Sequence, residues 1–104
     1  MFASIPPDIQ WGESWGPVEE HGEGLTAEFY REISDQHILH GVKVQAVGRR
    51  FDCDDVLFVT NDLTRPVVIV HLTWIGQTEK DPRWPSTGIY RGWDDPKLLA
   101  ELSE

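Results

Sequence analysis

His71 and two acidic residues earlier in the chain form the group with the clearest potential for proton-transfer chemistry. His71 lies within the apolar run Val67–Leu72, and Asp54 and Asp55 lie just before another apolar run. A hairpin between the two runs places Val56 opposite His71 and makes Asp54 a diagonal neighbour, about 7–8 Å away at Cα. Because an Asp–His pair can orient a general base, His71 with Asp54 or Asp55 is a candidate catalytic pair. A core histidine bonded to an acid would explain the same pattern, and no serine or second histidine is placed to complete a triad.

Cys53 is the second reactive residue of this segment, and it stands between Asp52 and Asp54. Neighbouring carboxylates disfavour a thiolate, so they raise the pKa of the thiol and make Cys53 a poor nucleophile. We therefore interpret Cys53 as a small turn residue. As the only cysteine of the chain, it excludes an intrachain disulfide and fits a reducing compartment.

His37 and His40 have the spacing that two metal ligands have on one face of a helix. Gly41 follows directly, however, and the segment offers no clear third ligand. The pair is better interpreted as capping or solvent-facing histidines. The sequence therefore predicts no metal centre, and nothing in it indicates a cofactor.

A long segment rich in tryptophan and proline, residues 76–93, has neither a helical nor a strand period apart from a short stretch near its end. Loops of this length in small domains are usually functional or packed by their own side chains. Indoles beside prolines give rigid apolar surface suited to recognition, although they would equally attach a long loop to a sheet. The candidate binding residues in and beside this loop are Trp74, Arg83, Trp84, Tyr90 and Trp93.

The strands that position these residues are predicted from runs of β-branched side chains. Val67–Leu72 is apolar at both odd and even positions, which indicates a central strand covered on both faces. Residues 56–60 have the same two-sided character, and residues 42–50 alternate as a half-buried strand at or near an edge does. These three strands predict an antiparallel meander, with residues 88–91 as a possible short fourth strand.

Two helices are predicted to flank the sheet. Residues 25–34 have apolar side chains at helical spacing, with Glu28 and Glu32 on the outward face. Residues 95–102 form a short closing helix, capped by an aspartate that a proline follows. The apolar residues expected to face inward are Leu25, Phe29 and Ile33 of the first helix and Leu98, Leu99 and Leu102 of the second.

The fold class is therefore α+β: a three- to four-stranded antiparallel meander with an N-terminal and a C-terminal helix side by side and a long Trp/Pro loop. The chain of 104 residues is expected to form a single domain, in which residues 1–24 are an irregular arm that lays Trp11 and Trp15 on the rest. One helical layer leaves the other sheet face uncovered, so the loop, the arm or a second copy must cover it. A homodimer is a reasonable expectation.

The net charge of −9 is concentrated near the N-terminus, where residues 1–40 hold eight acidic residues and one basic residue, Arg31. Such a surface repels phosphate backbones, which argues against a nucleic-acid partner and would suit a basic one. A solvated face that keeps the protein in solution is the simpler explanation of the charge. No apolar stretch has the length of a membrane span, so no membrane partner is expected.

Three segments carry a resemblance to other proteins: CDDVLF at 53–58, VHLTW at 70–74 and DPRWP at 81–85. Together they resemble a family of small, uncharacterised bacterial proteins, and the likeness extends over residues 25–95. The resemblance implies a bacterial, cytoplasmic, stand-alone α+β domain. It implies no activity and no functional residue.

Two functions from different classes are compatible with these features, and whether the protein is an enzyme stays open. The first is a non-catalytic module that binds a protein or peptide partner, of which an inhibitor or immunity-type protein is one concrete version. The alternative is a small hydrolase or ligand-binding enzyme that uses His71 with Asp54 or Asp55. A purely structural or assembly role would need neither site.

Overall fold

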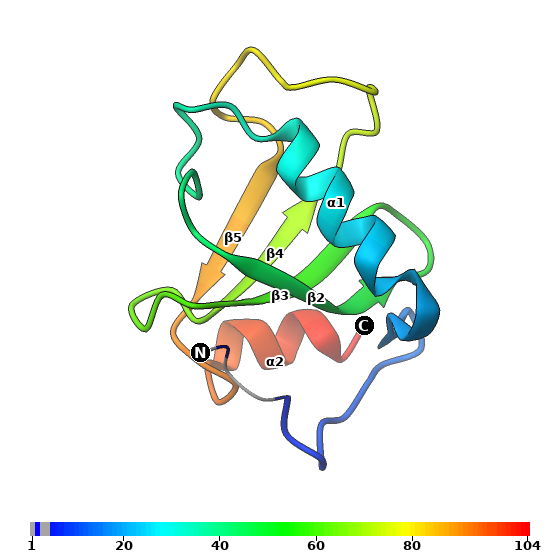
Figure 1. Ribbon diagram of the computed structural model, residues 1–104. Coiled ribbons are helices and arrows are strands. Elements are labelled where there is room, and N and C mark those ends of the chain that lie inside the picture. Colours follow the sequence, from blue (N-terminus) through cyan, green and yellow to red (C-terminus); the bar gives the residue numbers. More distant parts are fainter. Residues whose placement is uncertain (1, 3–4) are drawn as a thin grey trace.

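Five antiparallel strands form one sheet in the order β1-β2-β3-β4-β5, with a helix on each face (Figure 1). The computed structural model describes residue 2 and residues 5–104. The strands are β1 (Trp15–Pro17), β2 (Val44–Arg50), β3 (Asp55–Thr60), β4 (Val67–His71) and β5 (Ser86–Tyr90). The 3-10 helix η1 (Glu19–His21) leads into α1 (Gly22–Glu32), and α2 (Pro96–Leu102) closes the chain. Neither helix in this described part of the chain is long and apolar enough to cross a membrane.

The α+β meander predicted from the sequence is confirmed, but its strand number was wrong. β3 and β4 are buried on both faces and lie inside the sheet, as their two-sided patterns indicate. The first strand, β1, comes from the arm that was expected to be irregular, and it pairs with the end of β2. β5 pairs along the whole of β4, so the long loop ends in a full strand.

α1 covers one face of the sheet and also satisfies backbone donors of β2. Phe29 packs against Phe58 of β3, with ring centroids 5.1 Å apart, in the centre of this first core. The hydroxyls of Thr26 and Tyr30 accept hydrogen bonds from the N–H groups of Ala46 and Val44 at 3.1 and 2.8 Å. β1 pairs only with residues 48–50 of β2. Side chains of α1 therefore accept the N–H groups in the part of that strand edge which β1 does not reach.

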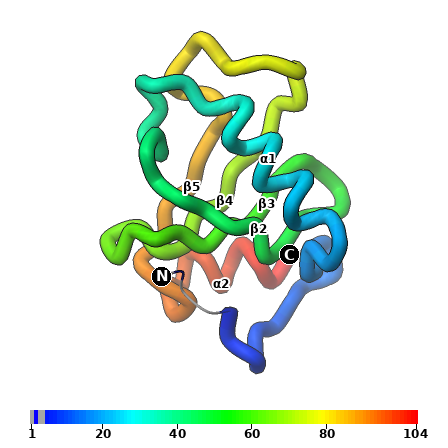
Figure 2. The backbone as a smooth tube through the Cα atoms, in the orientation of Figure 1, coloured from blue at the N-terminus to red at the C-terminus, as the bar shows by residue number. Residues whose placement is uncertain are grey.

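α2 and residues 9–15 of the N-terminal arm cover the opposite face, so the prediction that the two helices lie side by side was wrong. Figure 2 shows the arm running beneath α2, and the N–H of Gly12 donates to the carbonyl of Leu102 at 2.8 Å. Trp11 crosses β2 at Gly48, where any side chain would collide with the indole. Both faces are thus covered within one chain, which removes the reason for expecting a second copy.

Three side chains of the helices point the opposite way from the prediction. Glu28 and Glu32 were placed outward, yet they are 1% and 0% exposed. Leu99 was placed inward, yet it is half exposed, because Leu98 and Leu102 alone occupy the face of α2 that meets the sheet. The buried acids have specific partners near the candidate site.

Candidate functional site

Asp55 and His71 meet where β3 begins and β4 ends. The two residues are directly opposite in the sheet, and Asp55 Oδ1 lies 2.7 Å from His71 Nδ1. The predicted register was therefore wrong by one residue: Val56 lies opposite Val70 rather than His71. Asp54 contributes its backbone carbonyl, which accepts from the N–H of Leu72 at 3.1 Å, and is not the carboxylate bonded to His71. His71 is exposed at the strand end and is not a core histidine.

Cys53 joins this pair from the turn between β2 and β3. One donor atom each of Cys53, Asp55 and His71 lies within 4.8 Å of the others. Partial burial raises the pKa of the Cys53 thiol, and the charges of Asp55 and Asp52 add to the effect. The thiol is therefore largely protonated at neutral pH and is not an activated nucleophile.

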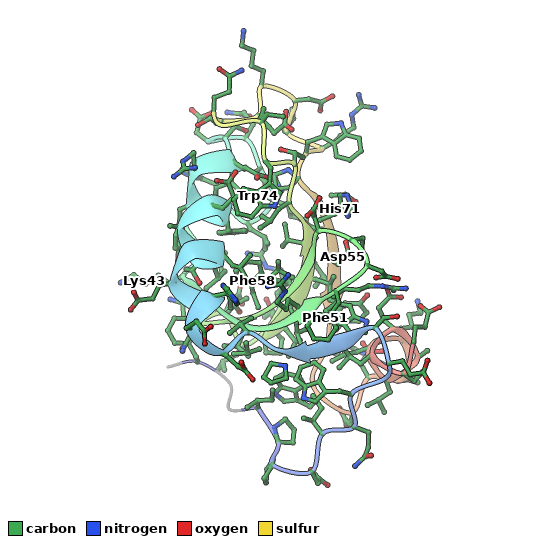
Figure 3. All side chains as sticks on the ribbon, turned by 90° about the vertical axis from the view of Figure 1, so that its right-hand side faces the viewer. Lys43, Phe51, Asp55, Phe58, His71 and Trp74 are labelled. Atoms are coloured by element: carbon green, nitrogen blue, oxygen red, sulfur yellow. The ribbon has the colours of Figure 1, made fainter. Side chains whose placement is uncertain are left out.

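A cleft of about 390 Å³ opens beside this turn. Its walls come from the start of α1, the end of β2, the turn before β3 and the segment after β4. The lining residues are Glu20, His21, Gly24, Leu25, Arg49, Arg50, Cys53, Asp54, Asp55, Val56 and Trp74. Figure 3 shows Trp74, His71 and Asp55 gathered at the same end of the sheet.

Trp74 is held in an uncommon backbone conformation at the wall of this cleft. Its φ is 53°, in the left-handed region that is unfavourable for a bulky residue. The N–H groups of Thr73 and Trp74 donate to the two carboxylate oxygens of Glu32, at 2.8 and 2.9 Å. The buried carboxylate of Glu32 thus fixes the backbone of Trp74, a residue that is itself 51% exposed.

Glu28 lies beside Glu32, one turn earlier on α1. A hydrogen bond with Glu32, the burial of the carboxyl and the negative charge of Glu32 raise the pKa of Glu28 to about 7, against the opposing effect of Arg31. The Oε2 atom of Glu28 is buried and has no hydrogen-bond partner among the described residues. A proton on Glu28, donated to Glu32, would satisfy this pair of acids.

The loop that follows Trp74 is attached to the end of α1 at several points. The Thr78 hydroxyl donates to the Arg31 carbonyl at 2.8 Å, and the Glu79 N–H donates to the Glu32 carbonyl at 2.8 Å. At the other end of the loop, His37 Nε2 lies 2.9 Å from the Pro85 carbonyl. His37 is buried and its Nδ1 accepts the N–H of Leu39, so it serves the backbone, whereas His40 is exposed.

The five predicted binding residues do not form one surface. Trp74 lines the cleft, while Arg83 and Trp84 lie exposed on the loop, where Arg83 is paired with Asp81. Tyr90 and Trp93 are partly buried and pack on the core beneath α2. The end of the loop therefore contributes to a core, as one interpretation of the sequence proposed, whereas the cleft is bordered by Trp74, just before the loop begins.

Sequence reasoning missed two members of the site. Glu32 was assigned to the solvent because acids are seldom buried, and its backbone partners lie about forty positions later in the chain. Cys53 was treated separately from His71, although a turn residue two positions before Asp55 can approach any residue opposite Asp55.

Comparison with protein-family models, curated proteins and solved structures gives no match for this chain.

Proposed function

We propose that the protein is a non-catalytic binding module that holds a basic peptide segment of a partner in the cleft beside Trp74. The observation that carries this proposal is the way in which Trp74 is held. A half-exposed indole is kept in an unfavourable backbone conformation by two hydrogen bonds to a buried carboxylate. Strain of this kind persists where the surrounding structure enforces it, and such positions cluster at functional sites.

The fixed indole suits recognition because binding would cost it little conformational freedom. An aromatic anchor that is already ordered loses less entropy than a mobile one when a partner docks. Tryptophan also has the best face for a cation, and a lysine or arginine placed over it gains about 0.5–2 kcal/mol. Trp74 therefore offers a platform for a basic side chain.

The charges around the cleft favour the same occupant. Glu20, Asp54 and Asp55 line it together with Arg49 and Arg50. Arg50 is already paired with acids outside the cleft, namely Asp52, Glu101 and Glu104. The net charge of −9 of the whole chain adds a long-range attraction for a basic partner.

The proposal is tested with short fluorescein-labelled peptides, each made in a Lys/Arg-bearing version and a matched version with glutamate at the same positions. Fluorescence polarisation with the full chain, in EDTA and a reducing agent, measures the two affinities. We expect the basic version to bind more tightly and its affinity to fall with added salt, because salt screens exposed charges. The variant Trp74→Ala should bind the basic peptides about ten-fold more weakly, a loss of about 1.4 kcal/mol.

Trp84→Ala is the matched control, since Trp84 is a similarly exposed indole that does not line the cleft. Its affinity for the basic peptides should equal that of the wild type. Equal binding of basic and acidic versions would contradict the proposal. So would equal affinities of the Trp74→Ala and Trp84→Ala variants.

A small hydrolase that uses His71 is the second candidate, and the 2.7 Å contact with Asp55 favours it. Because the pKa of Cys53 is raised, the nucleophile would be a water molecule activated by His71. A panel of 4-nitrophenyl esters and phosphates tests this alternative. Turnover that is lost in His71→Gln but kept in His40→Gln would support it, and equal rates in the two variants would contradict it.

A further inference from the structure

The geometry points to a Zn²⁺ site formed by Cys53, Asp55 and His71 at the rim of the cleft. These residues bring one donor atom each to within 4.8 Å of the others, although the sequence alone predicted no metal centre. The site is distinct from peptide binding and does not depend on it, because the cleft and Trp74 would bind a peptide without a metal.

The types of donor suit zinc. Thiolate, imidazole and carboxylate are the three protein ligands that Zn²⁺ uses, whereas Mg²⁺ and Ca²⁺ prefer oxygen donors alone. A set of three protein ligands, with a further position for water, is typical of zinc sites that are open to solvent. Cys53 and His71 are exposed and Asp55 is partly exposed, so an ion from solution has direct access to all three.

The distances between the donor atoms require only small adjustments to fit zinc. Zinc–ligand bonds of about 2.0–2.3 Å in a tetrahedron place the donor atoms about 3.3–3.7 Å apart. The present donor atoms lie within 4.8 Å, and the Asp55–His71 contact of 2.7 Å is held by one proton. The ion would replace that proton and open this contact slightly, while the Cys53 side chain would move inward by about 1 Å.

The fold brings the ligands together through rigid elements. Asp55 and His71 are opposite residues of paired strands, and the Leu72 N–H to Asp54 carbonyl bond continues that pairing beyond the strand ends. Cys53 follows from the same turn, two positions before Asp55. Binding would release the thiol proton of Cys53 to solvent, while a neutral imidazole bound through Nδ1 keeps its own proton on Nε2, so affinity should rise with pH.

The test uses the full chain, reduced and freed of metal, titrated first with Co²⁺ and then with Zn²⁺. Co²⁺ bound through Cys53 gives a sulfur-to-cobalt charge-transfer absorption, which carboxylates and histidines on an acidic surface do not give. We expect this absorption at one ion per chain, its loss when Zn²⁺ displaces Co²⁺, and its absence in Cys53→Ser. Zinc affinity, measured by competition with a chelating dye, should fall at least about ten-fold in Asp55→Asn and in His71→Gln.

Asp54→Asn is the matched control, because it removes the same charge from the neighbouring residue without removing a ligand. Its zinc affinity should stay within about two-fold of the wild type. The inference is overturned if the wild type shows no cobalt–thiolate absorption. It is also overturned if Asp54→Asn weakens zinc binding as much as Asp55→Asn, or if Cys53→Ser leaves zinc affinity unchanged. Thermal unfolding without metal confirms that each variant is folded.

Discussion

Two groups of ionisable residues lie near Trp74 and have opposite environments. Glu28 and Glu32 are buried beneath α1, where Glu32 binds the backbone of the segment after β4. Cys53, Asp55 and His71 lie at the open end of the same sheet, and the side chains of Asp55 and His71 are 19% and 47% exposed. Polar groups that are fully buried must find internal partners and so become structural, whereas exposed ones keep donor atoms available for a ligand.

The largest expected effect comes from Glu32→Gln. In the wild type, each of the two carboxylate oxygens accepts one backbone N–H, from Thr73 and from Trp74. Glutamine keeps one of these oxygens and replaces the other with an NH₂ group, which cannot accept, so one of the two N–H groups is left without a partner. The free energy of unfolding should fall by about 2–4 kcal/mol, measured by urea denaturation at neutral pH.

Glu23→Gln supplies the comparison, because Glu23 is an exposed acid in the first turn of the same helix. It should change the free energy of unfolding by no more than about 0.5 kcal/mol. If Glu32→Gln and Glu23→Gln unfold at the same urea concentration, Glu32 has no structural role and the contrast between the two groups fails.

Glu28→Gln is expected to change how stability depends on pH. The pKa of Glu28 is raised from 4.5 to about 7 in the folded protein, so the protonated carboxyl stabilises the fold. That stabilisation is complete below pH 4.5 and is lost as the pH rises through about 7. Glutamine keeps a donor for Glu32 at every pH. The difference in unfolding free energy, variant minus wild type, should therefore rise by about 3 kcal/mol from pH 4.5 to pH 8.

Parallel curves for Glu28→Gln and the wild type between these pH values would show that Glu28 does not carry a proton in the folded state. The lowered pKa values of Asp62 and Asp81, about 2, affect stability only below this window. Glu23→Gln again serves as the reference and should run parallel to the wild type.

The central strands were predictable because their apolar side chains, present on both faces, directly indicate a buried environment. β3 and β4 are continuous β-branched and aromatic runs that fit only a sheet covered on both faces. α2 was equally predictable from the sequence, since Asp95 caps it and Pro96 occupies its first turn. Such local signals need no knowledge of the rest of the fold.

The remaining features depend on contacts between distant segments. β1 is a Trp-Gly-Pro segment with no strand period, and it is a strand because β2 offers it an edge. The helical pattern placed Glu28 and Glu32 outward, since nothing nearby in the chain reveals the backbone donors that Glu32 accepts. The Asp55–His71 pair required a register that was one residue from the predicted one, and such a shift exchanges the faces of every side chain.

The smallest expected effect lies in the exposed group. A double-mutant cycle of Asp55→Asn and His71→Gln, in EDTA, should give a coupling energy of about 0.2–1 kcal/mol, because a partly solvated pair gains little over its interactions with water. The coupling should shrink further in high salt. A coupling energy as large as the fall in unfolding free energy caused by Glu32→Gln would mean that Asp55 and His71 stabilise the fold as the buried acids do. The two residues would then have a structural reason to be adjacent, and their short contact would no longer argue for a ligand or a reaction at this end of the sheet.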